Sequence, residues 1–127
     1  MYTFKKEERL CNKKLIDELF HNGSSFLCYP IQVSWLFTDF TGHYPVQVVF
    51  SVPKRRFNHA TDRNLIKRRT RETYRRYKQD HLYATLNAAG KKIVLSVGYI
   101  GKEIASYDLA EKKMLKLLKL LSAEIAK

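Results

Sequence analysis

Apolar residues recur along the chain with two different periods, and each period predicts one kind of element. Between positions 12 and 22 they recur every three to four residues, which predicts a helix that Asn12 can cap and Gly23 can close. Over 29–37 and again over 46–52 they alternate with polar residues, as in half-buried strands. The short polar segment between these strands predicts an antiparallel hairpin. We expect the charged segment from Phe4 to Leu10 to be extended.

The second half of the chain begins with a long polar helix. Thr61 or Asp62 can cap it, and its pattern runs to about Tyr77. A loop that ends at Gly90 is expected next. Alternating apolar residues over 93–99 then predict another strand.

The last element is an amphipathic helix that Ser106 or Asp108 can cap, and its apolar stripe runs from Ala110 to Ile125. The order is therefore helix, two or more strands, helix, strand, helix. This order predicts an α/β sandwich of the α+β class, with helices packed on one mixed central sheet. The length suits a single domain over 1–127.

Charge is concentrated in one stretch. The chain has 24 lysines and arginines against 12 acidic residues, a net charge of +12. Eleven of the basic residues lie between Lys54 and Lys78, where only Asp62 and Glu72 oppose them, so this stretch alone has a net charge of +9. Such a concentrated field attracts a polyanion. The alternative is a solvated helix face that keeps the protein soluble, although such faces normally mix both signs.

Viewed as a helical wheel, the helix from Arg63 onward has two different sides. One side, with Ile66 and Tyr74, can face the sheet. The adjoining side is almost wholly cationic and contains Asn64, Lys67, Arg68, Arg71, Arg75 and Lys78. Like charges three or four residues apart repel by about 0.2–0.5 kcal/mol per pair, so helix stability does not explain this side. Phosphate binding does, because an arginine fork can take two phosphate oxygens and an asparagine amide can donate to phosphate or ribose.

Other kinds of site are not indicated. Cys11 and Cys28 lack the spacing of a zinc site, so we expect reduced thiols and no metal on the protein. The sequence shows no signal peptide and no apolar run that could span a membrane, which favours a cytoplasmic location. The four histidines are scattered and no nucleophile–base or paired-carboxylate motif occurs, so we expect no catalytic residue on the protein.

Several segments resemble bacterial ribonuclease P proteins. They are Phe4–Leu10, Leu19–Gly23, Phe50–Arg56 and, most specifically, Arg63–Glu72, which contains the family's Arg-Asn-x-x-Lys-Arg-x-x-Arg signature. With the flanking elements in order, the resemblance covers essentially the whole chain. It implies an αβββαβα-type fold with a left-handed crossover between the parallel strands on either side of the basic helix.

The resemblance also implies a function. The protein would be the RNA-binding subunit of an endoribonuclease that removes the 5′ leader from precursor tRNA, active only with its catalytic RNA. Magnesium ions held by that RNA would activate water, so the protein itself needs no cofactor. We expect a monomeric protein in a 1:1 complex with ribonuclease P RNA, without DNA or membrane partners.

Two groups of residues take part in this implied function. A cleft between the first helix, the sheet and the basic helix would hold the single-stranded leader, with Phe20 and Ile16 at its wall and either Ser34 or Trp35 on the first long strand. Core packing is the alternative role for Phe20 and Trp35. The residues expected to bind the catalytic RNA are Lys54, Arg55, Arg56, Arg63, Asn64, Lys67, Arg68, Arg71 and Arg75.

Three other functions compete with this one. A structural RNA-binding protein would use the same basic helix, but it would not distinguish precursor from mature tRNA. A DNA-binding regulator would need a helix-turn-helix partner or a dimer seam, which the pattern does not predict. A membrane-surface protein would expose the apolar stripe of its final helix, whereas this stripe has the pattern of a core-facing helix.

Overall fold

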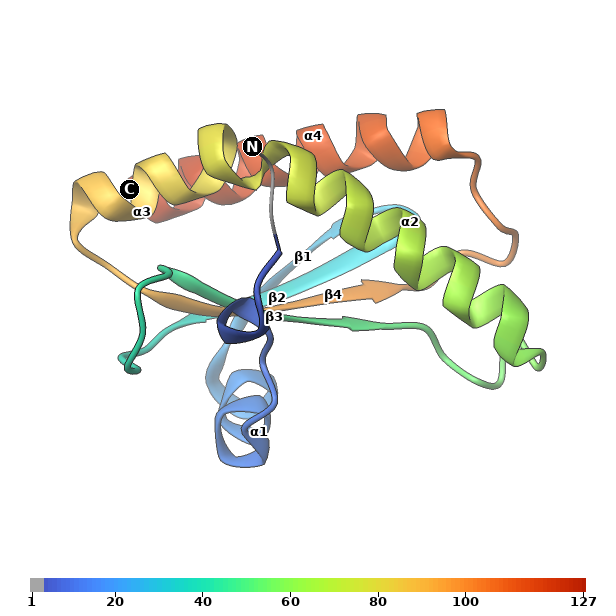
Figure 1. Cartoon of the computed structure of the whole chain (residues 1–127), viewed down its shortest axis with the longest axis horizontal. Helices are drawn as coiled ribbons and strands as arrows, with labels where there is room; N and C mark the ends of the chain where they lie inside the picture. Colours follow the sequence, from blue (N-terminus) through green and yellow to red (C-terminus); the bar gives the residue numbers. More distant parts are fainter. Residues whose placement is uncertain (1–3) are drawn as a thin grey trace.

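The computed structural model describes residues 4–127, which are organised around a four-stranded mixed sheet (Figure 1). The order across the sheet is β1 (Ser24–Cys28), β2 (Ile31–Phe37), β4 (Ile93–Tyr99) and β3 (Val46–Ser51). β1 pairs with β2 and β2 with β4 in antiparallel fashion, whereas β3 and β4 are parallel. The predicted α+β class with one mixed sheet is therefore confirmed.

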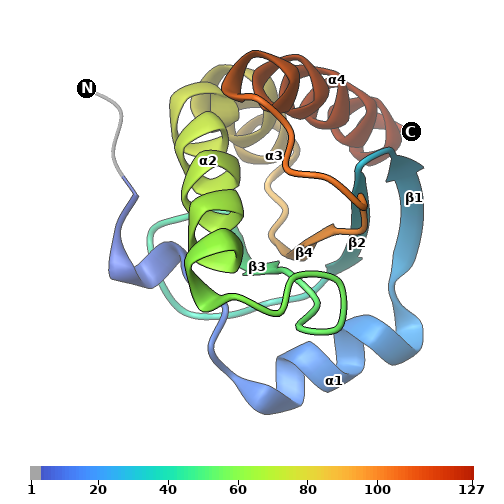
Figure 2. The same cartoon turned by 90° about the vertical axis from the view of Figure 1, so that its right-hand side faces the viewer.

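Helices cover both faces of this sheet. α1 (Lys13–Asn22) lies on one face, and α2 (Ala60–Lys78), α3 (Ala84–Ala89) and α4 (Tyr107–Ala126) lie over the other (Figure 2). In Figure 2 the C-terminal ends of β3 and β4 point toward the viewer, α2 lies above them, and β4 is to the right of β3. This arrangement makes the β3–α2–β4 crossover left-handed, as the resemblance implies and opposite to the usual hand.

The helix caps are mostly those that the sequence predicts. The Asn12 side chain accepts hydrogen bonds from two backbone amides of the first turn of α1, at 3.0 and 3.3 Å, and Gly23 follows its last residue. Ser106 caps α4 by accepting from the amide of Leu109 at 3.3 Å. α2 differs, because its N-cap residue is His59 and the helix begins at Ala60, whereas Thr61 or Asp62 was the predicted cap.

The predicted hairpin between β2 and β3 is wrong. β4 lies between these two strands, and the hairpin partner of β2 is β1, in a segment for which no strand was predicted. Burial explains the arrangement. Six of the seven residues of β4 are buried, so this strand takes a central position with helices over both of its faces.

The N-terminal segment is not wholly extended. Lys6–Glu8 form a single 3-10 turn, and the chain then runs beside the free edge of β3. There Arg9 forms a parallel bridge with Val48, and the amide of Leu10 donates to the Val48 carbonyl at 2.8 Å. The segment thus pairs with part of an edge that would otherwise expose unpaired backbone groups.

The expected loop between α2 and Gly90 is helical instead. A π-helical turn over Gln79–Tyr83 continues α2, and α3 follows directly. Leu82, Tyr83 and Leu86 are buried in the main core, which holds this segment in helical form. Gly90, with a φ of 66°, ends α3 in the left-handed conformation typical of a helix C-terminus.

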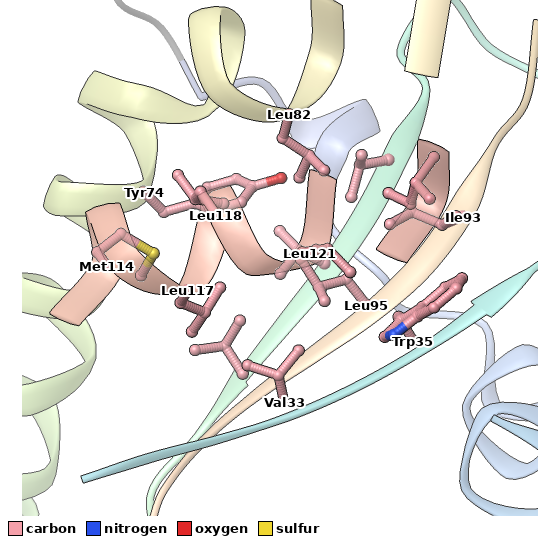
Figure 3. Close-up of a cluster of buried hydrophobic side chains, with 14 of the residues drawn as sticks. Val33, Trp35, Tyr74, Leu82, Ile93, Leu95, Met114, Leu117, Leu118 and Leu121 are labelled. Atoms are coloured by element: carbon pink, nitrogen blue, oxygen red, sulfur yellow. The ribbon is translucent and has the colours of Figure 1, made fainter. Parts of the chain in front are cut away.

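Three clusters of buried apolar side chains hold the layers together. The main cluster fills the space between the sheet and the helices above it (Figure 3). A second cluster, with Leu10, Leu19 and Val94 fully buried, joins α1 to the opposite face of the sheet. A third cluster near the start of α2 contains Phe57, Ile66 and Tyr99.

Candidate RNA-binding surface

Lys67 and Arg71 lie one turn apart on α2, and both are exposed. Together with Arg9 they line a pocket of about 230 Å³ whose apolar wall includes Phe4 and Phe50. The centres of these two rings are 6.0 Å apart, and the Arg9 guanidinium carbon is 5.8 Å from the centre of the Phe4 ring. We call this site the Arg9 pocket. Three cations beside aromatic rings suit a nucleotide, which has an anionic phosphate and a flat base.

Arg63 has a structural role that the sequence pattern did not predict. Its Nη1 atom donates to the backbone carbonyls of Phe57, at 2.7 Å, and Asn58, at 3.0 Å. Phe57 is itself buried against Ile66 of α2. The loop that carries the exposed side chains of residues 54–56 is therefore fastened to the first turns of the basic helix.

The outward side of α2 also carries predicted RNA-binding residues. Asn64 and Arg68 are exposed. Arg75 is half-buried and pairs with Glu72: its Nε donates to Oε2 at 3.0 Å, and its Nη2 contacts Oε1. The hydrogen bond from Arg75 lowers the pKa of Glu72 below its usual value, so this carboxylate stays ionised at neutral pH. Glu72 therefore offsets part of the positive charge on this side.

Two further arginines on α2 contact α4 and the loop that precedes it. Arg76 donates to the hydroxyl of Tyr107 at 3.3 Å and to Glu111 at 3.0 Å. Arg69 donates to the backbone carbonyl of Ala105 at 2.7 Å. Arg76 therefore joins α2 to α4, and Arg69 joins α2 to the loop before α4.

The expectation for Lys78 was wrong. The helical wheel places it between Lys67 and Arg71 on the cationic side, but its side chain is only 5% exposed and pairs with Glu8, whose side chain is fully buried. The ammonium nitrogen lies 5.1 Å from the ring centre of Tyr83 and 5.2 Å from that of Phe4, and within 6.0 Å of those of Tyr44 and Tyr74. Burial lowers the pKa of Lys78. Lys78 is therefore part of the interior and not of the exposed cationic side of α2.

The residues expected at the leader cleft are separated by the sheet. Phe20 is 61% exposed at the end of α1, so core packing does not explain it. Ile16, one turn earlier, is half-buried and packs in the cluster beneath α1. Trp35 is 8% exposed and belongs to the main core on the other face of the sheet, which removes it from the α1 side. Because side chains alternate along a strand, Ser34 lies on the α1 side instead.

Ser34 is one of three serines that the strand register brings together. It pairs with Ser25 of β1 on one side and with Ser96 of β4 on the other. This row lies on the sheet face that α1 covers in part, and it offers hydroxyl groups rather than a second aromatic ring. The register could not be read from the sequence, because β1 was not predicted and β4 was not placed beside β2.

Acidic, histidine and cysteine side chains do not gather in the part of the chain that the structure describes. Over residues 4–127 no three of them come together in a way that could hold a metal ion. Cys11 is exposed, Cys28 is buried, and both are free thiols. None of the helices within these residues is long and apolar enough to span a bilayer.

Comparison with known proteins gives one consistent result. The family model described as Ribonuclease P matches residues 4–121. A ribonuclease P protein component of Porphyromonas gingivalis is 31% identical over 120 residues, covering 92% of this chain and 85% of the relative. A ribonuclease P protein component of Chlorobium phaeobacteroides is 33% identical over 130 residues, covering 91% of this chain and 86% of the relative.

Solved structures share the fold. The ribonuclease P protein of Thermotoga maritima superposes with a TM-score of 0.67 at 24% identity, covering 89% of this chain and 96% of that one. The Staphylococcus aureus protein does so with a TM-score of 0.66 at 18% identity, covering 94% and 98%. With the family model matching nearly the whole chain and two relatives above 30% identity, this chain belongs to the ribonuclease P protein family.

Proposed function

We propose that this protein is the RNA-binding subunit of a ribonuclease P holoenzyme that removes the 5′ leader from precursor tRNA. Membership in the family implies tRNA processing and an RNA partner. The observation that carries the proposal is the Arg9 pocket, where Arg9, Lys67 and Arg71 meet beside aromatic rings. None of the residues that line the pocket is acidic, so no carboxylate in the lining offsets these three charges. A polyanion that also presents flat bases is the partner that this combination fits best.

The basic surface is proposed to bind the catalytic RNA. It consists of the Arg9 pocket, the exposed side of α2 and the loop that Arg63 fastens to that helix. Its residues are Lys54, Arg55, Arg56, Arg63, Asn64, Lys67, Arg68, Arg71 and Arg75. By neutralising phosphates, these residues lower the magnesium concentration that the folded RNA needs.

The α1 side of the sheet is proposed to hold the leader. Phe20 offers an exposed ring on which one base can stack. Ile16 lies one turn away, and the serine row at Ser34 offers hydrogen bonds to ribose and phosphate rather than a second stacking platform. Because mature tRNA lacks a leader, these contacts favour substrate over product.

The chemistry of cleavage is assigned to the RNA. Magnesium ions held by the RNA activate water for attack on the phosphodiester, and the protein contributes no catalytic side chain and binds no cofactor of its own. We infer one protein per RNA, acting in the cytoplasm, with neither DNA nor membrane as a partner. The protein's role is to bind the RNA, to neutralise its phosphates and to orient the precursor.

A comparison of the affinities for precursor tRNA and for mature tRNA tests this proposal. The full-length protein is combined with the ribonuclease P RNA of its own source, with calcium in place of magnesium to slow cleavage. The affinities of the complex for precursor tRNA and for mature tRNA are then compared. The proposal predicts tighter binding of the precursor, with a difference that disappears when the protein is omitted. Equal affinities would instead favour a structural RNA-binding protein.

A further inference from the structure

A second pocket, of about 510 Å³, lies at the C-terminal end of β4. The turn between β1 and β2, the loop over 100–106 and the first turns of α4 form its walls. It shares no lining residue with the Arg9 pocket. None of the roles described above uses it, and we call it the Tyr29 pocket.

The Tyr29 pocket gathers apolar side chains that solvent would otherwise surround. Seven large hydrophobic residues are exposed within residues 4–127, and three of them line this one pocket: Tyr29 at 55%, Ile104 at 37% and Leu109 at 41%. Single exposed apolar residues are normal on a protein surface, but a cluster around a hollow marks a binding site. The exposed tyrosine ring gives this site a flat surface suited to a planar group.

The side chains that line the pocket carry a net positive charge. Lys102 and Lys113 lie among the lining residues, and Glu103 is the acid that opposes them. Ser106, which caps α4, also lines the pocket, so the N-terminal end of a 20-residue helix lies at its edge. The helix dipole adds partial positive charge there. The occupant is therefore expected to join a flat apolar group to an anion.

Hydrogen bonds hold the wall of the pocket in place. The Tyr99 hydroxyl accepts from the amide of Ala105 at 3.0 Å and donates to the carbonyl of Glu103. Arg69 of α2 donates to the Ala105 carbonyl at 2.7 Å, which fastens this loop to the basic helix. At Gly101 a Cβ atom would lie 2.8 Å from that of Pro30, so the loop approaches the neighbouring turn too closely for a side chain. These contacts hold the loop against α2 and against the turn between β1 and β2.

We propose that the Tyr29 pocket binds a single unstacked nucleotide of RNA. The base lies against Tyr29 and Leu109, and the phosphate is bound by Lys102 and Lys113. The inference rests on the proposed function for its RNA partner. Because Arg69 joins the pocket wall to α2, an RNA bound along α2 lies on the element that supports the pocket.

A titration with adenosine 5′-monophosphate tests the site on the intact protein alone. Backbone amide resonances are followed by NMR as the nucleotide is added. The proposal predicts shifts at Gly101, Lys102 and Ile104 that are clearly larger than those caused by adenosine or by inorganic phosphate at the same concentration. Absence of nucleotide-induced shifts at these amides, with shifts confined to α2, would overturn it.

Two variants sharpen the test. Tyr29→Ala removes the exposed ring. Phe37→Ala removes a 41% exposed ring at the far end of β2, which lines neither the Tyr29 pocket nor the Arg9 pocket. Tyr29→Ala should weaken association with ribonuclease P RNA about tenfold, whereas Phe37→Ala should not. Equal effects of the two substitutions would contradict the proposal. If Tyr29→Ala unfolds, Tyr29→Leu keeps apolar contact without the ring and should still abolish the nucleotide-specific shifts.

The outcomes separate this inference from the proposed function. If the wild-type protein supports precursor cleavage but the shifts at the Tyr29 pocket are absent, or persist in Tyr29→Ala, only the inference fails. If the pocket binds nucleotide but the precursor is not preferred over mature tRNA, the nucleotide site stands and the leader-binding function fails.

Discussion

Glu8 and Lys78, 70 positions apart in the sequence, form an ion pair in which both side chains are buried. The Glu8 carboxylate also accepts hydrogen bonds from the Tyr83 hydroxyl, at 2.5 Å, and from the backbone amide of Lys5, at 2.6 Å. This network fastens the N-terminal segment to the last turn of α2. Because Arg9 directly follows Glu8, the ion pair also places Arg9 at the pocket that it shares with α2.

Removing the cation of this pair should destabilise the fold. Lys78→Met leaves the Glu8 carboxylate buried without its partner, and we expect a loss of about 3 kcal/mol in the free energy of unfolding, measured by urea denaturation. Lys119→Met, at an exposed position of α4, should change it by less than about 0.5 kcal/mol. Adding Glu8→Gln to Lys78→Met should recover part of the loss. Full stability of the Lys78→Met protein would show that the pair does not hold the segment.

Lys67 and Arg71 should act on RNA through charge. Alanine at either position should weaken binding to ribonuclease P RNA. It should also reduce the slope of log affinity against log salt by about 0.7–0.9, because one fewer counterion is released. Lys119→Ala removes the same charge from a helix outside the proposed surface and serves as the control. Unchanged slopes for Lys67→Ala and Arg71→Ala would rule out their phosphate contacts.

Phe20 should act on the leader and not on stability. Since its side chain is 61% exposed, Phe20→Ala should change the free energy of unfolding by no more than about 0.5 kcal/mol. In the complex with RNA it should weaken precursor binding roughly tenfold and leave mature tRNA binding unchanged. Leu120→Ala, at an exposed position of α4, is the matched control. Equal weakening for both tRNAs would disprove a role in leader binding.

Glu72 should oppose RNA binding. Glu72→Gln removes the carboxylate that competes with phosphate for the Arg75 guanidinium, so affinity for ribonuclease P RNA should rise several-fold at neutral pH. The Arg75 hydrogen bond holds the pKa of Glu72 below its usual value, so the carboxylate is charged at neutral pH and becomes neutral only as the pH falls through that lowered pKa. The affinities of the variant and the wild type should therefore converge in acid. A variant that binds RNA more weakly at neutral pH would contradict this account.

Local features of the sequence predicted much of the fold. The cap at Asn12, the cap at Ser106 and the alternation over 93–99 depend on near neighbours, so they could be recognised without the structure. The helical pattern that runs to about Tyr77 likewise predicted the basic helix. Strand order was not predictable in this way, because the insertion of β4 between β2 and β3 depends on burial from both faces.

The sequence predicted the candidate site only in part, because some of its features depend on contacts between residues that are remote in the sequence. A helical wheel places Lys78 beside Arg71 in angle, but the burial of Lys78 depends on Glu8, which is remote in sequence. Alternation along β2 showed that Ser34 and Trp35 face opposite ways, but which face α1 covers is set by tertiary packing. Arg9 was missed as a pocket residue because no local pattern shows that the N-terminal segment pairs with β3.

Cleavage of precursor tRNA at low magnesium tests the central claim most directly. The protein is mixed with the ribonuclease P RNA of its own source, and 5′ processing is followed with each component alone and with both together. We predict cleavage at the mature 5′ end that requires both components, with a clearly slower rate when Lys67 and Arg71 are both alanine. A folded protein that binds this RNA but gives no stimulation would contradict the account and would favour a structural RNA-binding role.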